Sequence, residues 1–166
     1  MQGLILTFNV INMVQMYTCE KEYEETVVKA VADPSFNGPI SLEGIDLEVK
    51  VNHLDDKNRI ILIMGNWEQK YVVAEPRQQK EGQPSLYIAS FAGVAYHEYK
   101  MSGLECGLWE VYEWDSPDLK PAGGGMIAPK EDGFVLFGKS IYYGEADHDK
   151  VADILTKIGY ETKVKR

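Results

Sequence analysis

The chain has 166 residues, of which 45% are apolar and 26% charged, and its 26 acidic against 17 basic side chains leave a formal net charge of −9. This length suits one domain with a packed core, and the near-average composition excludes a disordered tail or a coiled-coil rod. The negative charge repels polyanions and argues against a nucleic-acid binder, although one phosphate or another small anion stays a possible ligand.

The first half of the chain predicts one helix and one hairpin. Apolar residues at helical spacing, preceded by acidic residues, predict a helix over residues 19–31. Alternation over 45–52 predicts a half-buried strand, and the continuous apolar run 60–64 predicts a strand buried on both faces. The polar, proline-containing segment 75–84 then predicts an exposed loop between two halves of the chain.

The second half predicts further strands before a final helix. Residues 85–101 follow neither period cleanly, and we favour a helix for their second part, while the alternating segment 109–114 predicts a strand. Residues 126–137, around a turn at 130–133, predict a second hairpin.

The last helix has the clearest pattern in the chain, and a short strand over 160–164 is expected after it. Its apolar positions follow the helical period, acidic residues lie near its start and a glycine follows it: Val151, Ile154, Leu155, Ile158, Asp147, Asp149, Gly159. Together the elements predict an α+β fold, with a mixed, largely antiparallel sheet and helices packed on it, as a single domain over 1–166.

Cysteine usage and hydropathy indicate a reduced cytoplasmic setting. Cys19 and Cys106 follow no CxxC or metal-ligand spacing, so we expect neither a disulfide nor a zinc site. The apolar segment 3–14 lacks a basic start and is interrupted by Asn9 and Asn12, so we interpret it as core rather than as a signal peptide. No apolar run reaches the roughly 18 residues of a membrane helix, so we expect a soluble protein with no membrane partner.

Glycines gather at 123–125, and a second glycine-containing stretch, 138–148, leads into the last helix. Glycines allow backbone N–H groups to approach a ligand, Ser140 offers a hydroxyl, Lys139 offers a charge, and the helix directs its positive end toward the turn. An anion site is one interpretation. The other is structural, with glycines allowing a bulge and a turn while Ser140 and His148 cap the helix, and spacing alone favours it.

Ordered short matches in the final third resemble the Janus and phosphohistidine phosphatase family. The matching residues are Gly123, Gly124, Gly125, Ile127, Gly138, Ser140, Tyr143, Gly144, Ala146, His148, Ile154, Leu155 and Tyr160. Further upstream, Tyr96 and His97 match the family's Tyr-His pair, whose histidine is catalytic. Residues 1–43 have no family counterpart, so the resemblance divides the chain into an extension and a phosphatase-like part over 44–166.

The resemblance implies hydrolysis of a phosphoramidate P–N bond with His97 as nucleophile or general base. We expect no cofactor. It also implies a phosphate pocket formed by Gly124, Gly125, Lys139, Ser140 and Ile141, and it puts Arg59 near the family's substrate-binding lysine. The expected partner is a phosphorylated protein or a small phosphoramidate. Without the resemblance, His97 between Tyr96 and Tyr99 is interpreted as an ordinary half-buried histidine.

Two departures from the family pattern favour a different reading. Met126 stands where the family has a phosphate-binding arginine, and Glu98 replaces the small residue after the histidine. The alternative is a non-catalytic relative that binds a protein or a small anion.

A metal is not expected, because His53 beside Asp55 and Asp56 is typical of a solvated hairpin tip.

Overall fold

A computed structural model describes residues 25–42, 44–92 and 97–166, and the side chains of residues 41, 42 and 97–103 lie outside this description. Residues 25–32 are helical, which confirms the described part of the first predicted helix. We call them the 25–32 helix. No helix within the described residues is long and apolar enough to cross a membrane.

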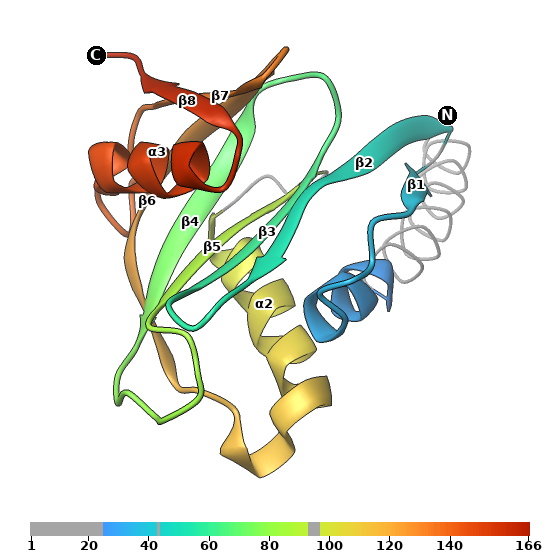
Figure 1. The fold of residues 1–166 in the computed structure, drawn as a ribbon, viewed down its shortest axis with the longest axis vertical. Coiled ribbons are helices and arrows are strands. Elements are labelled where there is room, and N and C mark those ends of the chain that lie inside the picture. The colour runs from blue at the N-terminus through green and yellow to red at the C-terminus, as the bar shows by residue number, and fades with distance from the viewer. Residues whose placement is uncertain (1–24, 43, 93–96) are drawn as a thin grey trace, which may run out of the picture.

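One sheet holds the strands of the described residues together (Figure 1). Its eight strands are β1 Pro39–Leu42, β2 Ile45–Leu54, β3 Asn58–Met64, β4 Gln69–Pro76, β5 Leu86–Phe91, β6 Leu119–Lys130, β7 Gly133–Phe137 and β8 Glu161–Val164. Their spatial order is β1-β2-β3-β5-β4-β6-β7-β8, and only the β3–β5 and β7–β8 pairs are parallel. The predicted α+β fold with a mixed, largely antiparallel sheet is therefore confirmed.

Helices cover both faces of the sheet. The 25–32 helix and α2, His97–Tyr112, pack on the face that carries Ile61, Val72 and Ala89, which we call the α2 face. The opposite face, the α3 face, carries Ile60, Tyr71 and Ile88 and packs against α3, His148–Lys157. The alternation of the strands divides the core into these two layers.

Three predicted segments agree with the structure. The first hairpin is β2 and β3, and residues 60–64 of β3 are buried on both faces as expected. The second hairpin is β6 and β7, with its turn at 131–132. The last helix is α3, followed by β8, and Gly159 has the positive φ that suits a helix exit.

The strand predicted over 109–114 is wrong. This segment is the end of α2, followed by a short 3-10 helix, Glu113–Asp115. Leu104 and Leu108 form its buried side at helical spacing, whereas Trp109 and Val111 are each 44% exposed. The apparent alternation belongs to the exposed side of a helix, where bulky residues are not constrained by the core.

Two strands were not predicted, and one was left open. β1 and β4 had no counterpart in the sequence interpretation, and β4 reaches into the segment expected to be a loop, ending at Pro76. Residues 86–91 of the ambiguous region form β5, and the helix favoured for its second part begins at His97. Central position makes β4 and β5 apolar on both sides, which removes the alternation that identifies a strand.

Candidate functional site

The consecutive glycines of β6 face opposite sides of the sheet. Gly124 is in register with Val72 on the α2 face, and Gly125 is in register with Tyr71 on the α3 face. A Cβ at Gly125 would lie 2.5 Å from Cε1 of His148. Gly125 is therefore required for close packing beneath α3, independently of any ligand.

Gly124 anchors the chain that leads into α3. Its N–H donates to the Gly144 carbonyl at 3.0 Å, and its own carbonyl accepts the N–H of Ala146 at 3.0 Å. Gly123 allows this approach, because it has φ +120° and a Cβ there would lie 2.7 Å from the Ala146 nitrogen. The amide of Gly124 thus holds the loop in place rather than standing free for a phosphate.

Residues 140–144 form a closed loop, which we call the 140–144 loop. The N–H of Ser140 donates to the Gly144 carbonyl at 3.2 Å, and the N–H of Gly144 returns to the Ser140 carbonyl at 3.0 Å. Ser140 is buried, and its hydroxyl oxygen accepts the N–H of Tyr143 at 3.2 Å. Both ends of the loop and one of its interior amides are therefore fixed.

The tip of the 140–144 loop carries two available donors. Within the part of the chain that the structure describes, the N–H groups of Ile141 and Tyr142 have no hydrogen-bond partner. These two residues are 93% and 72% exposed, and Lys139 beside them is also exposed. Consecutive unpaired amides next to a cation are a chemical basis for binding an anion.

The side chain of His148 forms a hydrogen bond with Gly138, at the start of the segment that leads into the 140–144 loop. Its Nε2 lies 2.7 Å from the Gly138 carbonyl, and its Nδ1 pairs with the Tyr71 hydroxyl. A carbonyl can only accept, so Nε2 carries the proton and Nδ1 accepts from the tyrosine. Burial raises the pKa of Tyr71, which keeps this hydroxyl a donor.

Asp147, not His148 or Ser140, caps α3. Its carboxylate accepts the N–H of Lys150 at 3.1 Å, so an acidic side chain occupies the helix N-terminus. The positive end of this helix is therefore not open toward a phosphate, contrary to the expectation from the sequence. The unpaired N–H groups of the 140–144 loop are the better candidates for binding an anion.

His97 is the first residue of α2, and its side chain lies outside the described residues. The chain reaches α2 from the carboxyl end of β5. There Ala89 is in register with Val72 of β4, and Val72 in turn with Gly124, so Gly124 lies two strands, about 10 Å, from Ala89. The start of α2 and Gly124 thus belong to the same face of the sheet, and the catalytic role of His97 stays a prediction.

Met126 and Lys70 are direct neighbours on the α2 face. They are Cα partners across β4 and β6, and Met126 follows Gly124 by two residues on the same side of its strand. A Cβ at Gly138 would touch the Met126 side chain at 3.4 Å. Lys70 therefore places a cation near the position where the predicted pocket lacks its arginine.

A family model for the Janus/Ocnus family matches residues 56–163, well over half of the chain. This chain belongs to the Janus/Ocnus family. No curated protein shows significant similarity to it. The matched region begins in the β2–β3 turn, so the 25–32 helix, β1 and β2 precede it, and the boundary predicted at residue 44 falls earlier than the match.

Arg59 lies inside the Janus/Ocnus match but contacts residues outside it. Its Nη2 donates to the carbonyls of Ala30 at 3.2 Å and Val31 at 2.9 Å, and its Nη1 donates to Oδ1 of Asn52 at 2.7 Å. These contacts satisfy carbonyls at the end of the 25–32 helix. Burial lowers the pKa of Arg59 to about 10, so the guanidinium is charged at neutral pH.

The structure places Arg59 at the opposite end of α2 from His97. Arg59 lines a cavity with Leu108 and Tyr112, at the end of α2, whereas His97 begins this 16-residue helix. At 1.5 Å per residue the two ends of α2 are about 22 Å apart. Of the predicted site residues, the structure thus gathers Gly124, Lys139, Ser140 and Ile141, turns Gly125 to the other face, and leaves Arg59 apart.

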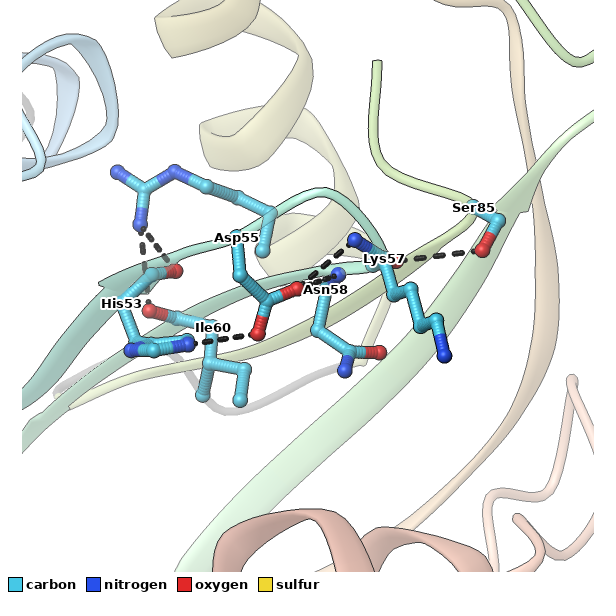
Figure 2. Close-up of polar contacts among 7 residues, drawn as sticks. His53, Asp55, Lys57, Asn58, Ile60 and Ser85 are labelled. Atoms are coloured by element: carbon cyan, nitrogen blue, oxygen red, sulfur yellow. Dashed lines mark hydrogen bonds and ion pairs between the residues drawn. The ribbon is translucent and has the colours of Figure 1, made fainter. Parts of the chain in front are cut away.

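The turn at which the Janus/Ocnus match begins is ordered by one carboxylate. Figure 2 shows Asp55 between the ring of His53 and the backbone of the following residues. Its Oδ1 accepts the N–H groups of Lys57 at 2.8 Å and Asn58 at 2.7 Å, and its Oδ2 lies 2.8 Å from Nε2 of His53. Among the described residues no group of His, Cys, Asp and Glu could hold a metal ion.

Sequence reasoning missed two residues of this site. Tyr142 was passed over because its contribution is a backbone N–H, which every residue except proline has. Lys70 was passed over because β4 was not predicted, and only the strand register puts this lysine beside Met126.

Proposed function

We propose that this Janus/Ocnus chain binds a phosphoryl group at the 140–144 loop and hydrolyses the P–N bond of phosphohistidine or of a small phosphoramidate. The observation that carries the proposal is the pair of unpartnered N–H groups of Ile141 and Tyr142, at the tip of a loop fixed by hydrogen bonds among the described residues. Donors held in place before the ligand arrives stabilise developing negative charge without reorganisation.

Two lysines supplement these amides. Lys139 adjoins the 140–144 loop, and Lys70 lies across the strand from Met126 on the α2 face. In a protein with a net charge of −9, local cations are needed to attract a phosphoryl dianion.

His97 is the proposed reacting imidazole. As a nucleophile, a ring nitrogen bonds to phosphorus while the P–N bond of the substrate breaks and the leaving nitrogen takes a proton; water then releases phosphate from His97. As a general base, His97 takes a proton from the water that attacks phosphorus directly. Both routes consume one water and yield phosphate and the free amine or imidazole.

Hydrolysis of a phosphohistidine peptide by the full chain and by His97→Ala tests the proposal. We expect His97→Ala to be slower by about 10²–10⁴-fold, the usual contribution of such a group. His53→Ala is the matched control, since His53 contacts Asp55 in the β2–β3 turn, and it should retain activity. Trapping of ³²P on His97 in a rapid quench would identify the nucleophilic route.

Equal rates in His97→Ala and the wild type would remove His97 from the mechanism. Absence of hydrolysis, together with phosphate-induced shifts of the Ile141 and Tyr142 amides, would instead support the non-catalytic anion-binding alternative. Met126 favours this alternative, because it stands where the family has a phosphate-binding arginine. Absence of both would refute the phosphoryl site itself.

A further inference from the structure

Two exposed tryptophans form a pair at the end of α2. Trp109 lies in the last turn of this helix, and Trp114 lies in the 3-10 helix that follows it. Their rings meet edge to face, with centroids 5.0 Å apart and planes at 80°, yet Trp114 is 87% exposed. Figure 1 shows α2 (yellow) running to the lower edge of the molecule, away from α3. Adjoining aromatic rings that are open to water are typical of a binding surface.

The segment that carries Trp114 is held in place by the structure around it. The carbonyl of Asp115 accepts hydrogen bonds from Nε2 of Gln83 at 3.2 Å and from Nζ of Lys80 at 3.4 Å. Glu113 has φ +50°, and among the described residues no other residue except glycine has a positive φ. Such conformations persist only where the surroundings enforce them, and they gather at functional sites. The ring of Trp114 is therefore presented to solvent by a fixed backbone.

The charges around the tryptophan pair are negative. Residues 104–118 contain no basic residue and five acidic ones, which are Glu105, Glu110, Glu113, Asp115 and Asp118. Within the described ranges only Asp118 of these five has an ion pair, with Arg77 at 3.6 Å. Glu105 precedes Trp109 by one helical turn, and Glu110 follows it directly. The aromatic surface thus lies among carboxylates that this part of the chain does not neutralise.

The position of these carboxylates is unfavourable for the isolated protein. The carboxyl end of a helix is partially negative and is stabilised by cations. The last turn of α2 has no basic residue, and instead Glu110 lies within it and Glu113 directly after it. Burial and the neighbouring carboxylate of Asp118 raise the pKa of Glu105, so its charged form is disfavoured too. Local rules that are broken without compensation inside the protein are expected at functional sites.

We propose that the tryptophan pair and the carboxylates beside it bind an arginine-rich segment of a partner protein, with one guanidinium stacked on Trp114 and another paired with Glu110 and Glu113. A guanidinium suits this surface because it stacks on aromatic rings and forms paired hydrogen bonds with carboxylates. A second copy of this chain suits it poorly, because two negative surfaces would meet. The surface lies at the opposite end of α2 from His97, so the proposal does not depend on the phosphoryl site.

Titration of the ¹⁵N-labelled full chain with a capped peptide of alternating arginine and glycine, at constant ionic strength, tests the proposal by NMR. We expect saturable shifts of the indole N–H signals of Trp109 and Trp114. Trp67 is the matched reference, since it is 41% exposed in the β3–β4 turn, and its signal should not move. A peptide with citrulline in place of arginine has the same shape without the charge, and it should bind at least tenfold more weakly.

Two substitutions separate the ring from the charge. Trp114→Ala removes an exposed ring, so it should fold normally, and it should weaken peptide binding about tenfold. Glu113→Gln should weaken binding about threefold, as is usual for an exposed ion pair. Glu131→Gln is the matched control, because this exposed carboxylate lies at the β6–β7 turn, and it should bind the peptide as the wild type does.

Four results would overturn the proposal. Equal affinity of Trp114→Ala and the wild type, equal affinity for the arginine and citrulline peptides, or a shift at Trp67 as large as at Trp114 would each leave only attraction to the net charge. A dimer of the wild type that Trp114→Ala abolishes in analytical ultracentrifugation would assign the surface to a second copy of this chain.

Discussion

The hydroxyl of Tyr71 and Nδ1 of His148 form a buried hydrogen bond between β4 and the first residue of α3. The other ring nitrogen of His148 bonds to the carbonyl of Gly138, two residues before the 140–144 loop. The imidazole of His148 thereby connects the segment before the loop to β4, at the centre of the sheet.

Replacing His148 should destabilise the protein, because it removes this connection. We expect His148→Ala to lower the free energy of unfolding by about 1–3 kcal/mol, because a buried hydroxyl and a carbonyl lose their partner. Urea unfolding measures the change. A double-mutant cycle with Tyr71→Phe should give a coupling of about 0.5–3 kcal/mol. Strict additivity of the two substitutions would show that the contact contributes no stability.

The proposed donor of Tyr142 is a backbone N–H, which a proline at this position lacks. Tyr142→Pro lacks the N–H, whereas Tyr142→Ala keeps it and removes only an exposed ring. We expect Tyr142→Pro to lower kcat/KM for a phosphohistidine peptide by about 10²-fold, as is usual for one oxyanion donor, and Tyr142→Ala to stay within a few-fold of wild type. Equal losses in the two variants would assign the effect to the ring or to the fold of the loop.

Lys70 should contribute to attraction of the phosphoryl dianion. We expect Lys70→Met to raise KM for the peptide about tenfold at low salt, with a smaller difference from the wild type at high salt, because screening weakens the interaction. Lys130→Met is the control, since Lys130 is exposed at the β6–β7 turn. A salt-independent effect of Lys70→Met would point to packing instead of charge.

The β2–β3 turn should stabilise the fold in a pH-dependent way. Burial alone would raise the pKa of Asp55, but hydrogen bonds from His53, Asn58 and Lys57 outweigh it and hold this pKa below its ordinary value of 3.8. A carboxyl whose pKa is lower in the folded state stabilises the protein above its unfolded pKa, and this contribution is lost as the pH falls through the folded pKa.

Asp55→Asn should therefore unfold more easily than wild type at pH 7, by about 0.5–1.5 kcal/mol, and the gap should close below pH 4 as the wild-type carboxyl is protonated. Thermal unfolding from pH 2 to pH 7 measures it. Asp56→Asn is the control, because this exposed neighbour accepts none of the hydrogen bonds described for the turn. A gap of constant size across this range would rule out the ionised carboxylate as its source.

Local patterns predicted the elements whose surroundings are asymmetric. The face of α3 that packs on the sheet is apolar and the other polar, so its period is visible in the sequence. β4 lies between two strands and is covered on both faces, so its short apolar run carries no period. The segment 109–114 was wrongly predicted to be a strand, because the exposed aromatic residues of α2 imitate the alternation of a strand.

By itself, the sequence determined the fold class, the two hairpins, the last helix and the residues that resemble the Janus/Ocnus pattern, since each depends on neighbours within a few positions. Only the tertiary structure decided which backbone donors stand free and where Arg59 points. The N–H of Gly124 is taken by Gly144, and the guanidinium of Arg59 is taken by Val31, 28 positions away. Such hydrogen bonds join segments distant in the chain, and local periodicity contains no information about them.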